Sequence, residues 1–442
     1  MSNEKEINSS PNRTSLLKKN IIFSFLIKGW SAAIVFIMLP LTLKMLGPYN
    51  NGVWLTISSI LVWIDLLDIG LGNGMRNAVA KHCAEGNHEK VKETVSSTLF
   101  MLLCVIGVAF LILFPIVCLG DMNGMLGIDL NKVPELNGVL SVALLFVGAA
   151  LILKFIGNLY LGLQLPAVNN LIICLGQTVA LVGTAIAWLL DCHSLSVVVF
   201  INVASPFFIW LISYPLTFRV LYPKYRPTRK SVNLSTAKSL CSTGMQFFVL
   251  QICSLVLFAS TNIIISRLIS PIEVTTYQTA FRYFSIVMVL FTIVCMPFWN
   301  ATTDAYSRGD IEWIRRASRK MNLMMLLIFA GLILMLLLSD FVYKIWMKGV
   351  EVPISLSIGM AAYQMILILS MRYSYFLNGI GILRIQLVFT ILATIIFLPL
   401  AWGVCTLTHS VSYLVAVMCL VNIPGLIANV WKFNNIITDY GK

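Results

Sequence analysis

Long apolar runs dominate the chain and predict its secondary structure. Twelve stretches of about 20 or more residues are rich in Leu, Ile, Val, Phe and Met, and polar segments separate them. They cover residues 20–46, 52–75, 91–120, 136–163, 164–190, 194–221, 239–268, 273–301, 319–338, 352–378, 383–405 and 410–431. An α-helix of this length crosses a hydrocarbon core of about 30 Å. None of the runs has the period of two typical of a membrane barrel, so we expect an all-α integral membrane protein with twelve transmembrane helices.

Composition and charge support this interpretation. Of the 442 residues, 59% are hydrophobic and 11% are charged, and the mean hydropathy is +0.89. The net charge of +13 comes from Lys and Arg residues that gather in alternate polar segments, such as the linker from Tyr222 to Lys238. The positive-inside rule then places both termini on the cytoplasmic side of the membrane. A nucleic-acid surface would not alternate loop by loop, so we expect no nucleic-acid partner.

The two halves of the chain resemble each other as an internal repeat. A shift of 223 positions aligns Lys44 with Arg267, Pro48 with Pro271, Asn77-Ala78 with Asn300-Ala301, Gly86 with Gly309, Glu89 with Glu312 and Lys92 with Arg315. We therefore expect an N-terminal tail (1–19), a six-helix bundle (20–221), a basic linker (222–238), a second six-helix bundle (239–433) and a C-terminal tail (434–442). Six spans are an even number, so the repeats are parallel, an arrangement that places binding sites at the repeat interface.

The stretch "DIGLGNGMRNA", Asp68 to Ala78, has three glycines at alternate positions, a spacing that also occurs in phosphate-binding loops. Such a loop follows a short strand, whereas this one follows the long apolar run "GVWLTISSILVWIDLLDI". The equivalent end in the second half, "VCMPFWNA" (Val294 to Ala301), lacks these glycines. We interpret the glycines as bending or close-packing positions.

Two segments carry a family resemblance. "GVWLTISSILVWIDLLDIGLGNGMRNAVAKHCAEGNH" resembles the second-span signature of the polysaccharide or O-antigen flippases, and "YFLNGIG", Tyr375 to Gly381, is similar to their tenth-span exit. The layout is similar over essentially the full chain to the multidrug/oligosaccharidyl-lipid/polysaccharide exporter superfamily. The resemblance implies two bundles around a central cavity and alternating access. It also implies export of an undecaprenyl-diphosphate-linked oligosaccharide to the outer leaflet, with the bilayer and the polysaccharide polymerase machinery as further partners.

Charged residues inside the predicted spans are the candidate site. The cations are Lys28, Lys154, Arg282 and Arg372, and the acids are Asp65 and Asp68. A cation at mid-bilayer costs about 2.5 to 3.5 kcal/mol, so these side chains should face a cavity or a partner. Arg282 is deepest and shares a helical face with Thr275, Gln278 and Ser285. The surplus of cations would suit a diphosphate headgroup, which the resemblance implies as ligand.

Structural roles stay open for several of these residues. Lys28 and Asp68 lie at similar depth and could form an ion pair, Asp68 could pair with Arg76, and Lys154 and Arg372 could snorkel to the membrane surface. Asp65 and Asp68 are also candidates for coupling transport to H⁺ or Na⁺. We expect no other cofactor and no metal site, because "KHCAEGNH" (Lys81 to His88) lacks convergent ligand spacing.

The leading hypothesis is therefore a flippase for lipid-linked O-antigen, capsule or exopolysaccharide units, a secondary-type transporter rather than an enzyme. A multidrug or cation exporter of the same fold is the nearest alternative, and it would favour an acidic cavity. A membrane polysaccharide polymerase or ligase is a third reading. It is disfavoured because the longest outer loop, Asp121 to Leu136, contains no His and only scattered acids.

Overall fold

The fold was analysed in a computed structural model. The structure describes residues 10–68, 70–240, 252, 256, 260–307, 309–380, 382 and 384–439. Within these ranges the chain is all-α, as the sequence predicts, and it contains no strand. This confirms the all-α membrane architecture. In the seventh expected span (239–268), the longest continuously described stretch is residues 260–268.

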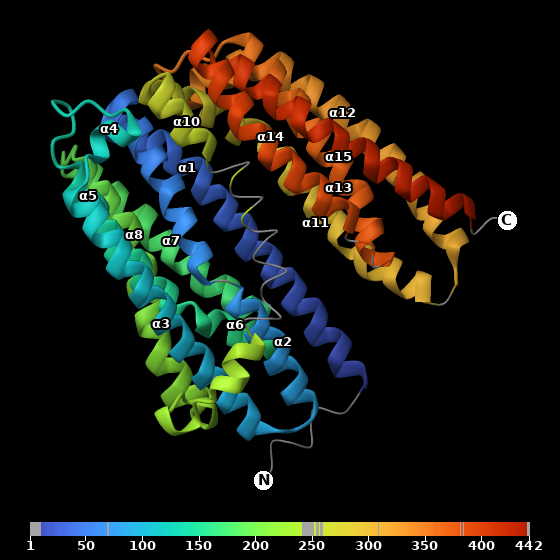
Figure 1. Ribbon diagram of the computed structural model, residues 1–442. Coiled ribbons are helices and arrows are strands. Elements are labelled where there is room, and N and C mark those ends of the chain that lie inside the picture. Colours follow the sequence, from blue (N-terminus) through green and yellow to red (C-terminus); the bar gives the residue numbers. More distant parts are fainter. Residues whose placement is uncertain are drawn as a thin grey trace. The chain divides into compact units, whose positions relative to one another are not determined.

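The helices run in chain order along the colour gradient of Figure 1. Their bounds are α1 (Ser10–Ile64), η2 (Asp65–Asp68), α2 (Leu71–Ala84), α3 (His88–Leu119), α4 (Met122–Leu126), α5 (Leu136–Leu153), α6 (Phe155–Gly162), α7 (Pro166–Leu189), α8 (Leu195–Pro215), η3 (Leu216–Leu221), η4 (Pro223–Tyr225), η5 (Arg229–Ser231), α10 (Ser260–Leu268), α11 (Pro271–Ser307), α12 (Ile311–Trp346), α13 (Ile354–Ile380), α14 (Arg384–Thr408) and α15 (Val411–Asp439).

Contacts divide the chain into two units. The described residues of Met1–Gly47, Leu61–Asn123 and Asp129–Val249 form the first, and those of Pro48–Ile60, Gly124–Ile128 and Leu250–Lys442 form the second. In the first unit α5 packs against α3 and α8, and α8 packs against α7; in the second, α13 packs against α11 and α15 (Figure 1). The second unit thus includes a piece of chain from the first half of the sequence, residues 48–60 on α1.

Nine helices of the described part are long and apolar enough to cross a membrane. One of them, Leu26–Ile64, contains most of the first expected span and the first half of the second, because α1 continues through a break at Gly47. Gly47 has φ 72°, a left-handed conformation that glycine adopts without steric cost. The apolar α11 covers the eighth expected span.

The glycine-rich stretch is confirmed as a bending and packing element. After α1 the chain tightens into the 3₁₀ turn η2 and then passes through Gly70 at φ 72° before α2 begins. A Cβ on Gly72 would overlap the amide nitrogen of Asn158, and a Cβ on Gly74 would lie 2.6 Å from the carbonyl oxygen of Leu240. Gly70 thus permits the turn, and Gly72 and Gly74 permit close packing. Helix α2, which contains Gly72 and Gly74, packs against α6 and α3.

The repeat is visible in local backbone geometry. The chain turns through Gly86 at φ 68° before α3 and through Gly309 at φ 73° before α12. The next residue caps the new helix in both cases, since Asn87 accepts a hydrogen bond from Lys90 N (3.1 Å) and Asp310 accepts one from Trp313 N (2.9 Å). The two corners are 223 positions apart, so the alignment found in the sequence marks two equivalent helix corners.

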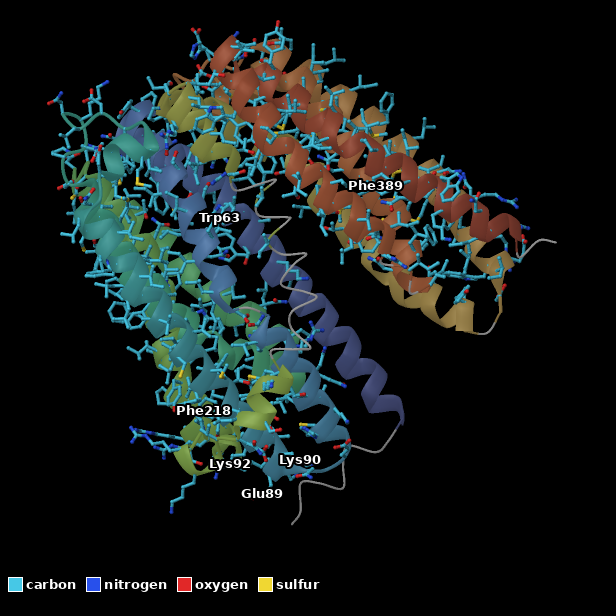
Figure 2. The ribbon with its side chains drawn as sticks, in the orientation of Figure 1. Trp63, Glu89, Lys90, Lys92, Phe218 and Phe389 are labelled. Carbon is cyan, nitrogen blue, oxygen red and sulfur yellow. The ribbon has the colours of Figure 1, made fainter. Side chains whose placement is uncertain are left out.

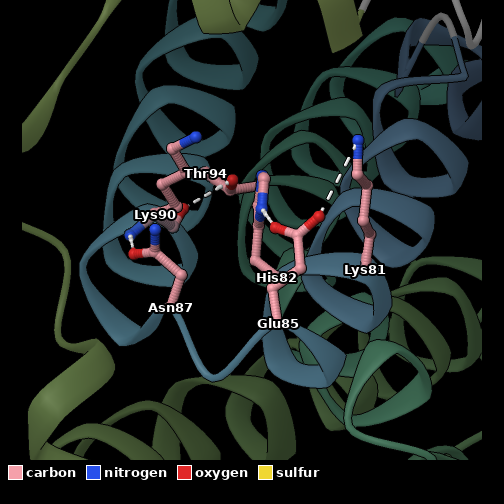
Figure 3. A network of polar contacts seen from close by, with 6 residues as sticks. All are labelled: Lys81, His82, Glu85, Asn87, Lys90 and Thr94. Carbon is pink, nitrogen blue, oxygen red and sulfur yellow. Dashed lines mark hydrogen bonds and ion pairs between the residues drawn. The ribbon is translucent and has the colours of Figure 1, made fainter.

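The corner before α3 also carries a polar network, shown in Figure 3. The Glu85 carboxylate lies 3.1 Å from His82 Nδ1 and 4.0 Å from Lys81 Nζ, next to the Asn87 cap. The hydrogen bond with His82 lowers the pKa of Glu85 below its usual value. This loop is the one that contains "KHCAEGNH", and it forms a helix corner in the structure.

The basic linker folds onto the start of α3. Thr228 N donates to Ser96 Oγ (3.1 Å), Asn233 N donates to Ser97 Oγ (2.9 Å), and Tyr225 OH lies 3.0 Å from His88 Nδ1. Burial raises the pKa of Tyr225 to about 12. The cations Lys90 and Lys92, labelled in Figure 2, lie on the same end of α3. The linker is therefore a folded part of the first unit.

Candidate functional site

A small charged pocket lies inside the first unit. Its volume is about 270 Å³, and its polar lining residues are Asp68, Lys154, Asn158 and Asn169. Trp210, Phe155 and four aliphatic side chains complete the walls. Two charged residues that the sequence singled out, Asp68 and Lys154, are thus brought together across a distance of 86 positions in the chain. Asp68 faces the same pocket as Lys154, which the sequence had not considered as its neighbour.

Irregular backbone presents both charges to this pocket. Asp68 ends the 3₁₀ turn η2, where its Oδ1 accepts a hydrogen bond from Gly72 N at 2.9 Å. Lys154 sits at the junction where α5 ends and α6 begins. Because Gly72 has no side chain, Asn158 can lie directly against the chain next to Asp68. Non-helical backbone at membrane depth is tolerated where it lines a polar cavity.

A network of buried polar side chains in the second unit, here called the polar ladder, connects α1, α10 and the start of α11. Thr275 Oγ1 donates to the Pro48 carbonyl (3.0 Å) and accepts from Asn51 Nδ2 (3.2 Å). One turn further along α11, Gln278 Nε2 donates to Asn262 Oδ1 at 2.9 Å. Asn262 is 3% exposed, and its own amide donates to Ser59 Oγ at 2.7 Å.

Arg282 follows on the same face of α11. The stripe that the sequence predicts, Thr275, Gln278, Arg282 and Ser285, is therefore present as one helical face. Thr275 and Gln278, the first two members of this face, form hydrogen bonds with residues 48–60 of α1 and with α10, respectively. Arg282 itself is half-buried and has interaction partners within the protein. Asn51, Ser59 and Asn262 belong to the ladder and were missed at the sequence level because they carry no charge: Asn51 lies between two predicted spans, and Ser59 and Asn262 are neutral residues inside predicted spans.

Arg372 is buried in the second unit. Only 6% of the residue is exposed, and one terminal nitrogen of its guanidinium donates to the Ser318 carbonyl (3.2 Å) and to Ser318 Oγ (3.1 Å). The guanidinium also lies 4.7 Å from the centre of the Tyr373 ring, a cation–π distance. Its Nε has no hydrogen-bond partner. Arg372 is therefore held by α12 and by its own neighbour in the chain.

The other two predicted site residues lie on the first part of the chain. Lys28 is exposed on α1, two residues before Trp30, whose indole Nε1 donates to Thr178 Oγ1 on α7 at 3.1 Å. The backbone of Asp65 begins the turn η2, but its side chain is outside the described residues. The roles predicted for Lys28 and Asp65 remain predictions.

A wide cavity of about 850 Å³ lies in the second unit at the start of α11 and the end of α12. Its charged lining residues are Glu273, Asp340, Lys344 and Glu351, and Lys344 Nζ contacts Asp340 Oδ2 at 2.6 Å. Residues 349–353 form another wall. The sequence contained no signal for this cavity, because its carboxylates come from three separate segments near helix ends.

Solved structures place the fold among membrane transporters. A multidrug resistance MATE family transporter of the MOP superfamily, in an inward-facing conformation, matches with a TM-score of 0.74 and 14% identity over 94% of this chain and 98% of its own. A MOP superfamily transporter from Pyrococcus furiosus, described as having a binding pocket of reversed polarity, matches with a TM-score of 0.61 and 15% identity over 96% of this chain and 95% of its own. The chain is thus a multi-pass membrane protein with a transporter fold.

The chain belongs to the polysaccharide biosynthesis protein family, whose model matches residues 17–298. A Yersinia pseudotuberculosis protein named for O-antigen export is 23% identical over 80% of this chain and 81% of its own length. A Salmonella typhi protein named as an O-antigen transporter is 22% identical over 75% and 76%. The predicted family is confirmed, and the chain is an exporter of the kind that serves polysaccharide synthesis.

Proposed function

We propose that this protein flips an undecaprenyl-diphosphate-linked oligosaccharide from the inner to the outer leaflet of a bacterial inner membrane by alternating access. The family and the O-antigen relatives support export of a polysaccharide unit. The observation that carries the choice of ligand is the cationic character of the helix interiors: Arg282 lies on the same face of α11 as the polar ladder, and Arg372 is buried. Guanidinium groups bind phosphate oxygens in a planar, bidentate way.

A multidrug or cation exporter would need the opposite charge in its binding region. The fold alone does not decide between the two, since the matched transporters include multidrug carriers. The Pyrococcus furiosus relative, with its pocket of reversed polarity, supports the view that this fold serves ligands of different charge. Arg282 and Arg372 favour an anionic headgroup here.

The test replaces the charge and keeps the size. In a flippase-deficient strain, Arg282→Gln should reduce surface polysaccharide at least about tenfold at equal protein abundance, because a lost charge-assisted contact costs about 1.5 to 3 kcal/mol. Arg384→Gln is the matched control, because Arg384 is exposed at the start of α14. Full surface polysaccharide with Arg282→Gln and Arg372→Gln would contradict the diphosphate assignment.

Proteoliposomes separate the two kinds of cargo. Purified protein should move a lipid-diphosphate-linked oligosaccharide, and it should not accumulate cationic dyes against a gradient. Dye transport without glycan transport would favour the multidrug alternative.

We further propose that uphill transport is coupled to H⁺ or Na⁺, with Asp65 and Asp68 as the candidate coupling groups. Asp68 supports this proposal by its place on the wall of the charged pocket. Asp68→Asn should abolish the dependence of glycan flipping on an imposed pH or sodium gradient, whereas Asp121→Asn, in the loop after α3, should leave it intact. Both termini are proposed to be cytoplasmic, which C-terminal reporter fusions that fluoresce only in the cytoplasm would test.

A further inference from the structure

An open groove in the first unit runs along the starts of two membrane-spanning helices. Its volume is about 470 Å³, and it lies between α5 and the beginning of α8, which lie side by side in Figure 1. Of its described lining residues, Glu135 and Ser196 are polar, and the others are a glycine, valines and a phenylalanine. The groove is therefore apolar along most of its length and carries a carboxylate at one end.

The polar end lies where the two helices enter the membrane. Leu136–Gly162 and Leu195–Leu221 are candidate spans, so Glu135 directly precedes the first of them and Ser196 is the second residue of the other. Ser196 Oγ donates to Glu135 Oε1 at 2.5 Å, so the two helix starts lie at the same level. Val142 lies seven residues further along α5, which is about 10 Å. The groove thus extends from the headgroup level of a bilayer into its hydrocarbon.

The apolar part of the groove is accessible from outside the protein. Val142 is 38% exposed and Phe200 is 46% exposed, and a Cβ on Gly138 would meet nothing within 4 Å. Phe200 packs edge-on against the ring of Phe146, with 5.4 Å between the ring centres. Because these residues belong to spans, their exposed surface borders the acyl chains of lipid.

The carboxylate of Glu135 is only partly used within the protein. Glu135 occupies the N-cap position of α5, yet its side chain forms no capping hydrogen bond. Within the described part of the chain Glu135 forms no ion pair, and its Oε2 accepts no hydrogen bond. A negative charge beside hydrocarbon is costly unless a cation or a donor accompanies it. Ser196 therefore fixes Oε1, and Oε2 is available to a ligand.

The equivalent place in the second half is apolar. The shift of 223 positions aligns Glu135 with Ile358 and Ser196 with Cys419. Ile358 is 52% exposed, as is usual for a side chain that borders lipid. Cys419 Sγ still contacts α13, because it lies 3.7 Å from the Gly359 carbonyl oxygen. The contact between these two helices thus does not require a carboxylate, and the acid is specific to the first half.

We infer that this groove binds one amine-headed phospholipid, with an acyl chain along α5 and α8 and the primary ammonium group at Glu135 Oε2. An ammonium N–H and a carboxylate form a charge-assisted hydrogen bond, which is among the stronger kinds. The carboxylate repels a headgroup whose only charge is negative, and a choline headgroup has no N–H to donate. The inference concerns a membrane lipid and is independent of the cargo, so it stands or falls separately from the proposed flippase activity.

Native mass spectrometry of the purified full-length protein measures this binding directly. Titration with a phosphatidylethanolamine should saturate one tight site per chain. Its affinity should exceed that of a phosphatidylglycerol or a phosphatidylcholine with the same acyl chains at least about tenfold, the gain expected from one charge-assisted contact. Glu135→Gln keeps an oxygen for Ser196 and removes the charge, so it should abolish this preference.

Two controls separate lipid binding from helix packing. Ser196→Ala removes the hydrogen bond to Oε1 and keeps the carboxylate, so the preference for the ethanolamine headgroup should persist. Gly138→Leu fills the groove and should lower the affinity for phosphatidylethanolamine, whereas Gly107→Leu, at an equally open position on α3, should leave it unchanged.

Three results would overturn the inference. Equal affinities for the three lipids, or an unchanged preference in the Glu135→Gln protein, would show that the groove does not recognise the headgroup. A preference lost equally in Glu135→Gln and Ser196→Ala would assign both residues to helix packing. Unchanged binding in the Gly138→Leu protein would place the lipid elsewhere.

Discussion

Gly52 and Pro271 form one of the closest backbone approaches in the second unit. Gly52 lies near the start of the second part of α1, and a Cβ added to it would overlap the carbonyl carbon and oxygen of Pro271 and lie 3.2 Å from its Cα. Both residues are buried. The obstacle is backbone, so it cannot move aside as a flexible side chain can. Gly52→Ala must therefore push residues 48–60 away from the start of α11.

The cost follows from two opposing effects. Overpacking costs typically 1 to 3 kcal/mol, and the overlap with a backbone carbonyl puts Gly52→Ala at the upper end, about 3 kcal/mol. Alanine regains about 1 kcal/mol through its better helix propensity. The net loss is about 2 kcal/mol, which for a unit of this size lowers the melting temperature by roughly 4 to 8 °C. The ladder at Thr275 is disturbed as well, because Thr275 Oγ1 bonds the Pro48 carbonyl.

Thermal unfolding of the purified protein in nanodiscs, followed by tryptophan fluorescence, measures the effect. Gly331→Ala is the matched control, because Gly331 lies inside α12 and a Cβ there would meet nothing within 4 Å. Its melting temperature should be equal to or slightly above that of the unchanged protein. A Gly52→Ala protein as stable as the Gly331→Ala protein would refute the close approach and the packing of residues 48–60 against α11.

Three further predictions concern the first unit. Asp68→Asn and Lys154→Met should each destabilise the protein by about 3 kcal/mol, because each removes one of two opposite charges that line the same pocket. The double variant should lose less stability than the sum of the single variants. Strictly additive shifts of the melting temperature would contradict this coupling. Gly70→Ala should cost about 1 to 2 kcal/mol, because Gly70 has φ 72°, and an unchanged melting temperature would exclude the left-handed turn. Burial raises the pKa of Tyr225 to about 12, so the stability that comes from its neutral phenol is fully present below pH 10, the usual pKa of tyrosine, and is lost as the pH rises through 12. Between pH 10 and 12 the melting temperature of the Tyr225→Phe variant should therefore fall less than that of the unchanged protein.

The overall architecture could be predicted because hydrocarbon imposes a simple rule on the sequence. Every backbone group in the membrane must be bonded within a helix, so run length and the absence of period-two alternation sufficed for the fold class. The repeat was equally accessible, because Gly86 and Gly309 mark corners that need a left-handed residue. Such local requirements leave a direct trace in the sequence.

The partners of the polar side chains could not be predicted. Asp68 and Lys154 line one pocket because the chain breaks at both positions, in η2 and between α5 and α6. The glycines after Asp68 indicated a bend, but nothing in the sequence indicated the break at Lys154 or the side chains that meet there. Depth in the membrane was the guide to partners, and depth suggested Lys28 as a neighbour of Asp68. Asn262 was missed for a related reason: a neutral side chain in a predicted span does not reveal its partners until the helices around it are placed.

The intramembrane charges do not follow the repeat that relates the two helix corners. Under the shift of 223 positions, Asp68 is aligned with Phe291, Lys154 with Leu377, Arg282 with Ser59 and Arg372 with Ala149. Each charge thus has an uncharged counterpart, whereas the corner residues Asn87 and Asp310 perform the same capping in both halves. A residue that only maintained a duplicated scaffold would be needed at both equivalent positions. The helix corners are alike in the two halves and the buried charges differ, so the charges give the two halves different roles. A carrier that binds one polar ligand needs such a difference between the two copies of a duplicated scaffold.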